Sequence, residues 1–227
     1  MPKAEAKVKA EAKIKIPDEP DKTAITIMGD KIIFVTIEYD ADTPNPCTDC
    51  DGMGHVRSLS NRHINNIDYD EAKQLLEDDP DVIPLSYFEH GNSVWMVQDS
   101  ARSHTPGIEF QWDGVRFAGV WIPDDCVRES YTGQDGLTRR EWMVKQAESC
   151  CETYTQWANG QCFYFRIGAY KLRADEDTGD NYEEEHDYRF RDELAEDSCG
   201  GHIGWEWAVQ ATTEAAESVL EQLNDPR

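Results

Sequence analysis

Apolar and polar residues alternate along several stretches of the chain, and such alternation predicts β-strands. Residues 24–40, AITIMGDKIIFVTIEYD, form two runs rich in β-branched residues around Gly29-Asp30, which is the pattern of a β-hairpin. Two further strands are expected on either side of Gly91. The remaining stretches that predict strands are 107–123, 161–175 and 202–207.

Three other stretches repeat their apolar residues every three to four positions, which predicts helices. The clearest is 138–158, where Thr138 and Glu141 fit the T-x-x-E capping box and Asn159-Gly160 fits a C-terminal stop. Shorter helices are expected at 68–81 and 212–224. The apolar face of the long helix is interpreted as core packing and consists of Met143, Ala147, Cys150, Tyr154 and Trp157.

Pairs of strands separated by single helices favour an α+β fold with a mostly antiparallel sheet. We expect one long central helix at about 138–158 and a second helix at the C-terminus. Residues 1–22 are rich in Lys, Ala and Glu and end near two prolines, so this segment is predicted to be a mobile tail. Residues 23–227 are expected to form a single α+β domain, because a chain of this length can bury a substantial core.

The chain is strongly acidic, with 46 Asp and Glu against 22 Lys and Arg, a formal net charge of −24 and a pI near 4.4. Such a protein repels nucleic acid and anionic membranes and attracts basic surfaces. Two interpretations of this charge involve no partner, because acidity aids solubility and a high-salt cytoplasm selects acidic surfaces poor in lysine. A third interpretation is mimicry of a phosphate backbone, directed at a DNA- or RNA-binding protein.

Acidic residues concentrate at 175–197, a segment with twelve acidic residues and two arginines. A DNA mimic needs carboxylates spaced like phosphates, with one charge per about 1.7 Å of duplex axis. A folded hairpin or helix could provide that spacing, and the alternative is a solvated loop. The residues expected to contact a basic partner are Glu77, Asp78, Asp79, Asp81, Asp175, Glu176, Asp177, Asp180, Glu183, Glu184, Glu185 and Asp187.

The stretch PCTDCDGMGH, residues 46–55, has the C-x-x-C-x-G-x-G spacing of a zinc-binding loop. Two histidines follow at suitable distances, so the candidate metal ligands are Cys47, Cys50, His55 and His63. A zinc ribbon contains a second C-x-x-C, which this chain lacks. A thiol pair without metal is therefore the alternative, and no cofactor other than zinc is expected.

The sequence lacks the motifs of several other classes of protein. It contains no G-x-S-x-G, no P-loop and no H-E-x-x-H, so a non-enzymatic role is favoured. His90, Asp113 and Cys199 could form a thiol site only if the fold brought them together. No apolar run of about 18 residues and no apolar signal core are present, so neither a membrane span nor secretion is expected. The seven cysteines are accordingly predicted to be reduced thiols or metal ligands.

Four landmarks occur in order along the chain: SYFEHGNSV (86–94), QWDGVRFAGVWI (111–122), ESCCETYTQWANGQCFYF (148–165) and EDSCGGHIG (196–204). Together they resemble the landmark motifs of a family of uncharacterised proteins encoded by tailed phages and mobile elements. The upstream piece DGMGHVRSLSNRHINN (51–66) is similar to another segment of that family. The likeness covers roughly residues 35–223, and the C-x-x-C pair is not part of the family pattern.

The resemblance implies a viral or mobile-element origin and a role in the host cytoplasm, but it brings no activity, cofactor or catalytic residue. We therefore expect an acidic phage-type protein that binds a basic, nucleic-acid-binding surface of a host protein. The expected partner is a defence protein such as a restriction or CRISPR nuclease, with no direct binding to nucleic acid or membrane. The sequence leaves open whether the chain forms a homo-oligomer.

Two alternatives remain. One is a structural or regulatory accessory protein of a phage, whose acidity reflects solubility or a high-salt host. The other is a zinc-stabilised module or a metal-dependent enzyme.

Overall fold

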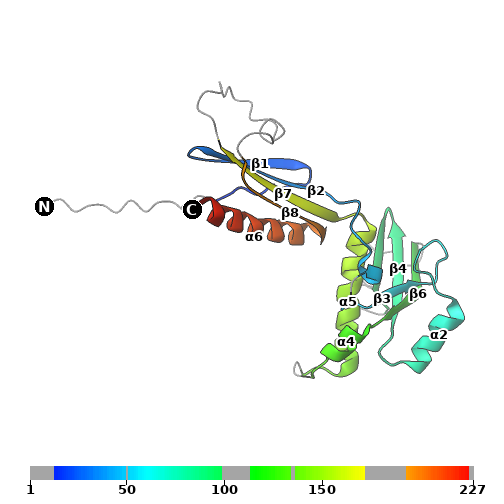
Figure 1. The fold of residues 1–227 in the computed structure, drawn as a ribbon. Coiled ribbons are helices and arrows are strands. Elements are labelled where there is room, and N and C mark those ends of the chain that lie inside the picture. The colour runs from blue at the N-terminus through cyan, green and yellow to red at the C-terminus, as the bar shows by residue number, and fades with distance from the viewer. Residues whose placement is uncertain (1–12, 50, 99–112, 134–135, 172–192, 225–227) are drawn as a thin grey trace. The chain divides into compact units, whose positions relative to one another are not determined.

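The structure, a computed structural model, describes residues 13–49, 51–98, 113–133, 136–171 and 193–224 (Figure 1). Its contacts divide the chain into two compact units. We call Met1–Asp40 with Phe163–Arg227 the terminal unit, and Ala41–Cys162 the middle unit. The sequence predicted one domain over residues 23–227, whereas each unit has its own sheet and its own hydrophobic core.

The terminal unit contains a four-stranded sheet with one helix along one face (Figure 1). The strand order is β1-β2-β7-β8, and β2 pairs antiparallel with both β1 and β7. Gly29 has a φ of +63° at the turn between β1 and β2, which confirms the predicted hairpin. The elements are β1 (Lys22–Met28), β2 (Lys31–Tyr39), β7 (Cys162–Lys171), β8 (Glu193–Ile203) and α6 (Trp205–Asn224).

The core of the terminal unit lies between the sheet and α6. Alternate residues of β2, among them Ile33 and Val35, pack with Ala208 and Val219 of the helix. Ile14 and Ile16 pack against the same core, although they belong to the segment predicted to be a mobile tail. Residues 1–12 of that predicted tail lie outside the described residues.

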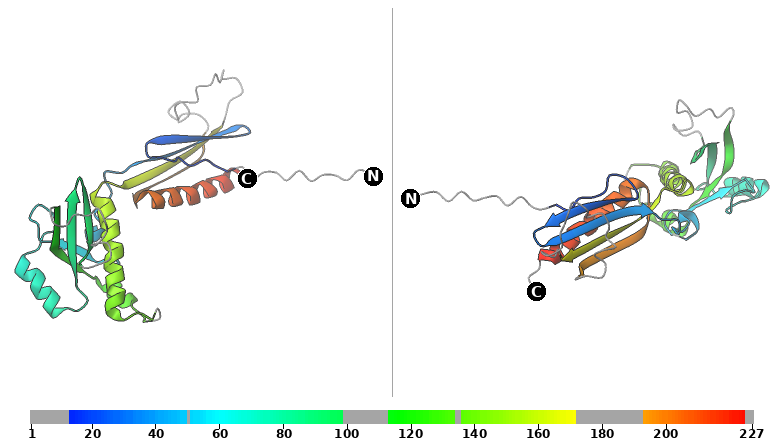
Figure 2. Two further views of the ribbon diagram at one scale, coloured as in Figure 1. Left: turned by 180° about the vertical axis from the view of Figure 1, so that it is seen from behind. Right: turned by 90° about the horizontal axis from the view of Figure 1, so that it is seen from above.

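The middle unit contains a second antiparallel sheet, with strand order β3-β6-β4-β5. Two helices cover its opposite faces, α5 on one and α2 on the other (Figure 2). Neighbouring residues of β6 show this division, because Trp121 packs with the α5 side and Val120 with the α2 side. The elements are α1 (Pro46–Asp49), β3 (His55–Ser58), α2 (Tyr69–Asp78), β4 (Ile83–His90), β5 (Asn92–Val97), β6 (Gly114–Ile122), α4 (Asp125–Ser130) and α5 (Arg139–Ala158).

Helix α5 confirms the helix predicted at 138–158. Thr138 is its N-cap, and the reciprocal hydrogen bonds between Thr138 and Glu141 form the expected capping box. Two side chains near its C-terminal end bond to the backbone of β5: Thr155 accepts from the N–H of Trp95 at 2.9 Å and Asn159 from that of Ser93 at 2.8 Å. The helix thereby fixes the position of a strand at the edge of the sheet.

The α+β class with antiparallel sheets and a C-terminal helix is confirmed. The prediction named α5 as the one long helix, whereas α5 and the C-terminal helix α6 have the same length of 20 residues each. The predicted strand at 202–207 is wrong. Its aromatic residues suit a strand, but Gly204, with a φ of +93°, ends β8 and α6 begins at Trp205. Among the described residues, no helix is long and apolar enough to cross a membrane.

Asp124 ties the loop before β3 to the N-terminus of α4. Its carboxylate accepts hydrogen bonds from the backbone N–H groups of Val127 at 2.7 Å, Gly52 at 2.7 Å and Gly54 at 3.0 Å. Partial burial opposes the charge of Asp124, but these three donors stabilise it and hold its pKa below the usual range. The two glycines of the PCTDCDGMGH stretch are thus anchored by a carboxylate about 70 residues downstream.

Replacing Asp124 by alanine is expected to destabilise the middle unit by about 1–2 kcal/mol at pH 7, because an N-cap and two loop anchors are lost. The folded pKa lies below the unfolded value of about 3.9, so this contribution is present above pH 4 and is lost as the pH falls through the folded pKa. Urea unfolding of the wild type and the variant at pH 7 and pH 3 should therefore show a difference that shrinks at pH 3. Asp125→Ala, a change at an exposed neighbour, serves as the control.

Candidate functional site

The candidate metal ligands have other contacts in the structure. Cys47 is buried, and its sulfur lies 3.5 Å from that of Cys150. The Nδ1 atom of His55 lies 2.6 Å from the carbonyl oxygen of Cys47, and Nδ1 of His63 lies 2.8 Å from Oγ of Ser58. Cys50 lies outside the described residues. Within the described part of the chain, no group of three or more His, Cys, Asp or Glu could hold a metal ion.

The acidic residues expected to bind a partner fall into three sets. The set from Asp175 to Asp187 lies outside the described residues. Glu77 and Asp78 are exposed near the end of α2. Asp79 and Asp81 instead pair with arginines of the same unit: Arg128 lies 2.7 Å from Asp79, and Arg139 lies 2.6 Å from Asp81. These two carboxylates therefore already have partners within the unit, and their predicted contact with a basic partner stays a prediction.

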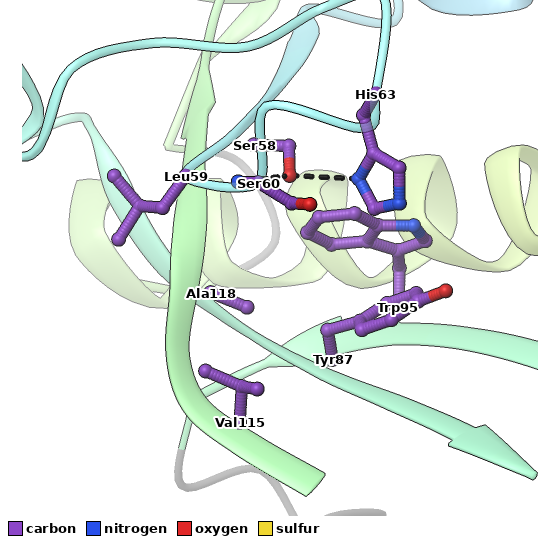
Figure 3. A pocket seen from close by; sticks show the side chains of 8 residues that line it. All are labelled: Ser58, Leu59, Ser60, His63, Tyr87, Trp95, Val115 and Ala118. Atoms are coloured by element: carbon purple, nitrogen blue, oxygen red, sulfur yellow. Dashed lines mark hydrogen bonds between the residues drawn. The ribbon is translucent and has the colours of Figure 1, made fainter.

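A pocket of about 230 Å³ opens on the α5 side of the middle unit (Figure 3). Its residues come from the end of β3, the loop that follows, and the three other strands of the sheet. Figure 3 shows aromatic side chains on one side of the pocket and aliphatic side chains on the other. The lining residues are Ser58, Leu59, Ser60, His63, Tyr87, Trp95, Val115 and Ala118.

The aromatic side of the pocket is formed by three rings in mutual contact. Tyr87 and Trp95 are directly opposite each other on β4 and β5, with ring centroids 4.8 Å apart. His63 packs edge-on against both, at 5.4 Å from Tyr87 and 5.7 Å from Trp95. Trp95 also contacts Tyr154 of α5, at 6.0 Å. The rings are therefore held by the sheet and the helix before any ligand arrives.

The Ser58–His63 pair resembles a nucleophile with its base, but its surroundings argue against that role. Ser58 is 1% exposed, and its Oγ accepts the N–H of Ser60 at 3.0 Å. The same Oγ lies 2.8 Å from Nδ1 of His63, so one hydroxyl group contacts both the loop backbone and the imidazole. Among the described residues, no carboxylate is hydrogen-bonded to His63. The pair therefore orients the ring as part of the pocket wall.

Two carboxylates neighbour residues that line the pocket, Glu89 through a hydrogen bond and Asp113 along the chain. Tyr87 donates its hydroxyl to Glu89 at 3.0 Å, and burial is the main cause that raises the pKa of Tyr87. Val115 is opposite Tyr87 on β6, and Asp113, two residues before it, lies 3.0 Å from Nδ1 of His90. Glu89, His90 and Asp113 are all exposed. An aromatic pocket with a carboxylate hydrogen-bonded to one of its rings favours a positively charged group.

His90 and Asp113 are two of the three residues that could have formed a thiol site, and the structure does bring them together. The third, Cys199, belongs to the terminal unit. It is exposed, and its sulfur contacts the carbonyl oxygen of Gly200. The His90–Asp113 pair is better described as a surface contact between β4 and the start of β6.

The pocket itself was not predicted from the sequence, although part of it could have been. Tyr87 and Trp95 stand four residues before and four residues after Gly91, so a tight hairpin at Gly91 places them opposite each other. His63 comes from a loop with no periodic pattern. That loop returns to β3 through a bridge between Ser58 and Asn66, which sequence patterns do not reveal.

Comparisons with protein-family models, curated proteins and solved structures gave no match to this chain. The resemblance to the family of phage and mobile-element proteins therefore stays a prediction. The pocket and the charge of the chain are the features that bear on function.

Proposed function

We propose that this protein binds a basic partner protein and that the pocket of the middle unit receives an arginine or lysine side chain of that partner. The observation that carries this proposal is the combination of three packed rings with the carboxylate of Glu89, which accepts a hydrogen bond from the Tyr87 ring of the pocket. Asp113 adds a second exposed carboxylate two residues before Val115 in the sequence. The net charge of −24 attracts a basic surface over a distance of about one Debye length, roughly 8–10 Å.

A cationic side chain matches both halves of the pocket. A guanidinium or ammonium group against the half-buried ring of Tyr87 gains about 0.5–2 kcal/mol from a cation–π contact. Trp95 is 3% exposed and supports that ring from within the core. The methylene groups of the same side chain can cover Leu59, Val115 and Ala118. Arginine suits the site better than lysine, because its planar head stacks on rings and binds carboxylates through two donors.

The partner that we favour is a nucleic-acid-binding protein of a host, since such proteins expose arginines and lysines to bind phosphates. Helix α6 of the terminal unit offers a second acidic surface of the same kind. Its sequence contains four glutamates and no lysine or arginine, and Glu206, Glu214, Glu217 and Glu221 are all exposed. Trp207 on this helix is 65% exposed.

The proposal is tested with an arginine-containing peptide and its citrulline counterpart, which has the same shape without the charge. Calorimetry should detect binding of the arginine peptide, at least about tenfold weaker binding of the citrulline peptide, and a loss of affinity as salt rises. Two variants should each reduce affinity by at least about tenfold: Glu89→Gln with Asp113→Asn, which removes the charges, and Val115→Trp, which fills the pocket. Val115 is 51% exposed, so the larger side chain can be accommodated without repacking the core.

The matched control is Asp70→Asn with Glu71→Gln. It removes two charges from exposed positions of α2, on the opposite face of the sheet, and should leave affinity unchanged. Equal affinity in all variants would contradict a role for the pocket. Equal loss in both charge variants would mean that only net charge matters. Absence of binding would favour the interpretation that the acidity reflects solubility.

The finer proposal, mimicry of a phosphate backbone, has a separate test. Reversing the charges of Glu183, Glu184 and Glu185 should abolish capture of a host nucleic-acid-binding protein at low salt. Capture that is insensitive both to this change and to salt would contradict it.

A further inference from the structure

Two buried cysteines from segments of the middle unit that are far apart in the sequence lie close together. Cys47 in α1 and Cys150 in α5 are separated by 103 positions, and their sulfur atoms are 3.5 Å apart. Each residue is 2% exposed. Neither the proposed partner nor the pocket uses these thiols.

The backbone around Cys47 is held in place on both sides. Its N–H donates to Oδ1 of Asn45 at 2.9 Å, and its carbonyl oxygen is in contact with the imidazole of His55. Cys150 is held within the 20-residue helix α5, whose capping box fixes its N-terminus. A disulfide of about 2.05 Å requires the two sulfurs, now 3.5 Å apart, to approach by about 1.5 Å.

We propose that Cys47 and Cys150 are a redox-active pair that forms an intramolecular disulfide when the protein meets a peroxide. The sulfur of one cysteine of the pair attacks one oxygen of hydrogen peroxide, the O–O bond breaks, and that cysteine becomes a sulfenic acid as one water is released. The thiol of the other cysteine then attacks the sulfenic sulfur, the S–O bond breaks and a second water is released. The two thiols lose two electrons and two protons in total, and one peroxide molecule is reduced to two water molecules.

Either sulfur can react first, because each residue is 2% exposed and either thiol could donate the hydrogen bond between them. The burial of both sulfurs selects a small oxidant, so peroxide should react faster than a bulky disulfide such as oxidised glutathione.

The disulfide would lock α1 to α5, the helix that contacts the pocket wall through Tyr154. Tyr154 is one helical turn beyond Cys150, contacts Trp95 at 6.0 Å, and is also hydrogen-bonded by Asn65. Burial raises the pKa of Tyr154 to about 12, so its phenol stays neutral. Oxidation at Cys47 and Cys150 is therefore expected to stabilise the element that positions the pocket.

The test uses the full chain with the exposed cysteines Cys126 and Cys199 replaced by serine, which prevents disulfides between molecules. The reduced protein is treated with hydrogen peroxide, remaining thiols are alkylated, and linked peptides are mapped by mass spectrometry. The expected product links Cys47 to Cys150. The melting temperature should rise by about 5–15 °C on oxidation, because the bond closes a long loop.

Cys150→Ala should abolish both the linked peptide and the rise in melting temperature, while its circular dichroism spectrum reports whether the variant is folded. If Cys150→Ala does not fold, the peptide map of the protein that keeps both Cys47 and Cys150 still tests the proposal. A Cys47–Cys50 or Cys150–Cys151 link as the main product would overturn the proposal. So would complete alkylation of Cys47 and Cys150 after peroxide treatment.

Discussion

Replacing Gly119 by alanine is expected to destabilise the middle unit by at least about 3 kcal/mol, because the added methyl group would overlap backbone atoms of a neighbouring strand. Gly119 lies in β6, which has β3 on one side and β4 on the other, opposite Ser58 and Leu85. A Cβ atom at this position would lie 2.1 Å from the carbonyl oxygen of Arg57 and 3.1 Å from its carbonyl carbon. Rotating a side chain cannot relieve this overlap, since both atoms belong to the backbone.

The overlap can be removed only by moving β3 away from β6. Ser58 at the end of β3 lines the pocket and orients His63, so the change should also weaken binding of the arginine peptide. Urea unfolding measures the loss of stability, and hydrogen exchange should show faster exchange in β3 and β6. The control is Gly29→Ala in the terminal unit, where φ is +63° and no atom lies within 4 Å of the added Cβ. Only backbone strain of about 1 kcal/mol is expected there. Similar losses in the two variants would mean that the contact with Arg57 is not the cause.

Much of the fold could be predicted because local patterns determine many of its elements. The hairpin around Gly29 and the capping box at Thr138 depend on residues that are neighbours in the sequence. Strand β3 escaped prediction because four residues between loops, His55–Ser58, are too few to establish an alternation. Its pairing with β6 joins His55 to Ile122, and no local pattern encodes a contact over such a distance.

The division into two units also could not be read from the sequence. Strand β7 follows α5 immediately in the chain, yet it pairs with β2 of the terminal unit, where Phe34 lies opposite Gly168. The chain leaves the sheet of the terminal unit after β2 and returns to it more than a hundred residues later at β7. No linker sequence marks the boundary between the two units where α5 ends and β7 begins. The alternation of strands and helices looks the same for one domain or two.

The candidate site was predicted less well than the fold, for a physical reason. A search of the sequence by residue type finds candidate site residues such as the thiols of the PCTDCDGMGH stretch and the residues of the most acidic segments. Whether a charge is available to a partner depends on what it contacts. Asp81 illustrates this, since it is 7% exposed and accepts hydrogen bonds from Arg139 and Arg128. The exposed Glu89, in a less acidic stretch, lies beside the pocket.

Asp81→Asn is accordingly expected to destabilise the middle unit by about 2–3 kcal/mol. The carboxylate of Asp81 accepts three hydrogen bonds from Arg139, at 2.6–3.0 Å, and one from Arg128 at 3.2 Å. The hydrogen bond that Arg139 donates to Asp81 is the main cause that raises the pKa of Arg139. Because a guanidinium stays charged at neutral pH without an acidic partner, Asp81→Asn leaves the charge of Arg139 without its counter-charge. Removing one partner of a fully buried pair costs about 3–5 kcal/mol, and a smaller value applies because water reaches these arginines. Their side chains are 27% and 44% exposed.

The matched control is Asp78→Asn, which removes the same charge from an exposed carboxylate three residues earlier that accepts a long hydrogen bond from Gln74. It should change the free energy of unfolding by less than about 0.5 kcal/mol. A double-mutant cycle between Asp81→Asn and Arg139→Gln should give a coupling energy above about 1 kcal/mol, since each change removes the same contact. Because Asp81 faces its own arginines, its loss should lower stability without weakening the arginine peptide's affinity for the folded protein. At a net charge of −24 the acidic side chains already repel one another, so removing any one of them changes that repulsion. Equal destabilisation by Asp81→Asn and Asp78→Asn would therefore show that net charge causes the effect, and would contradict a structural role for Asp81.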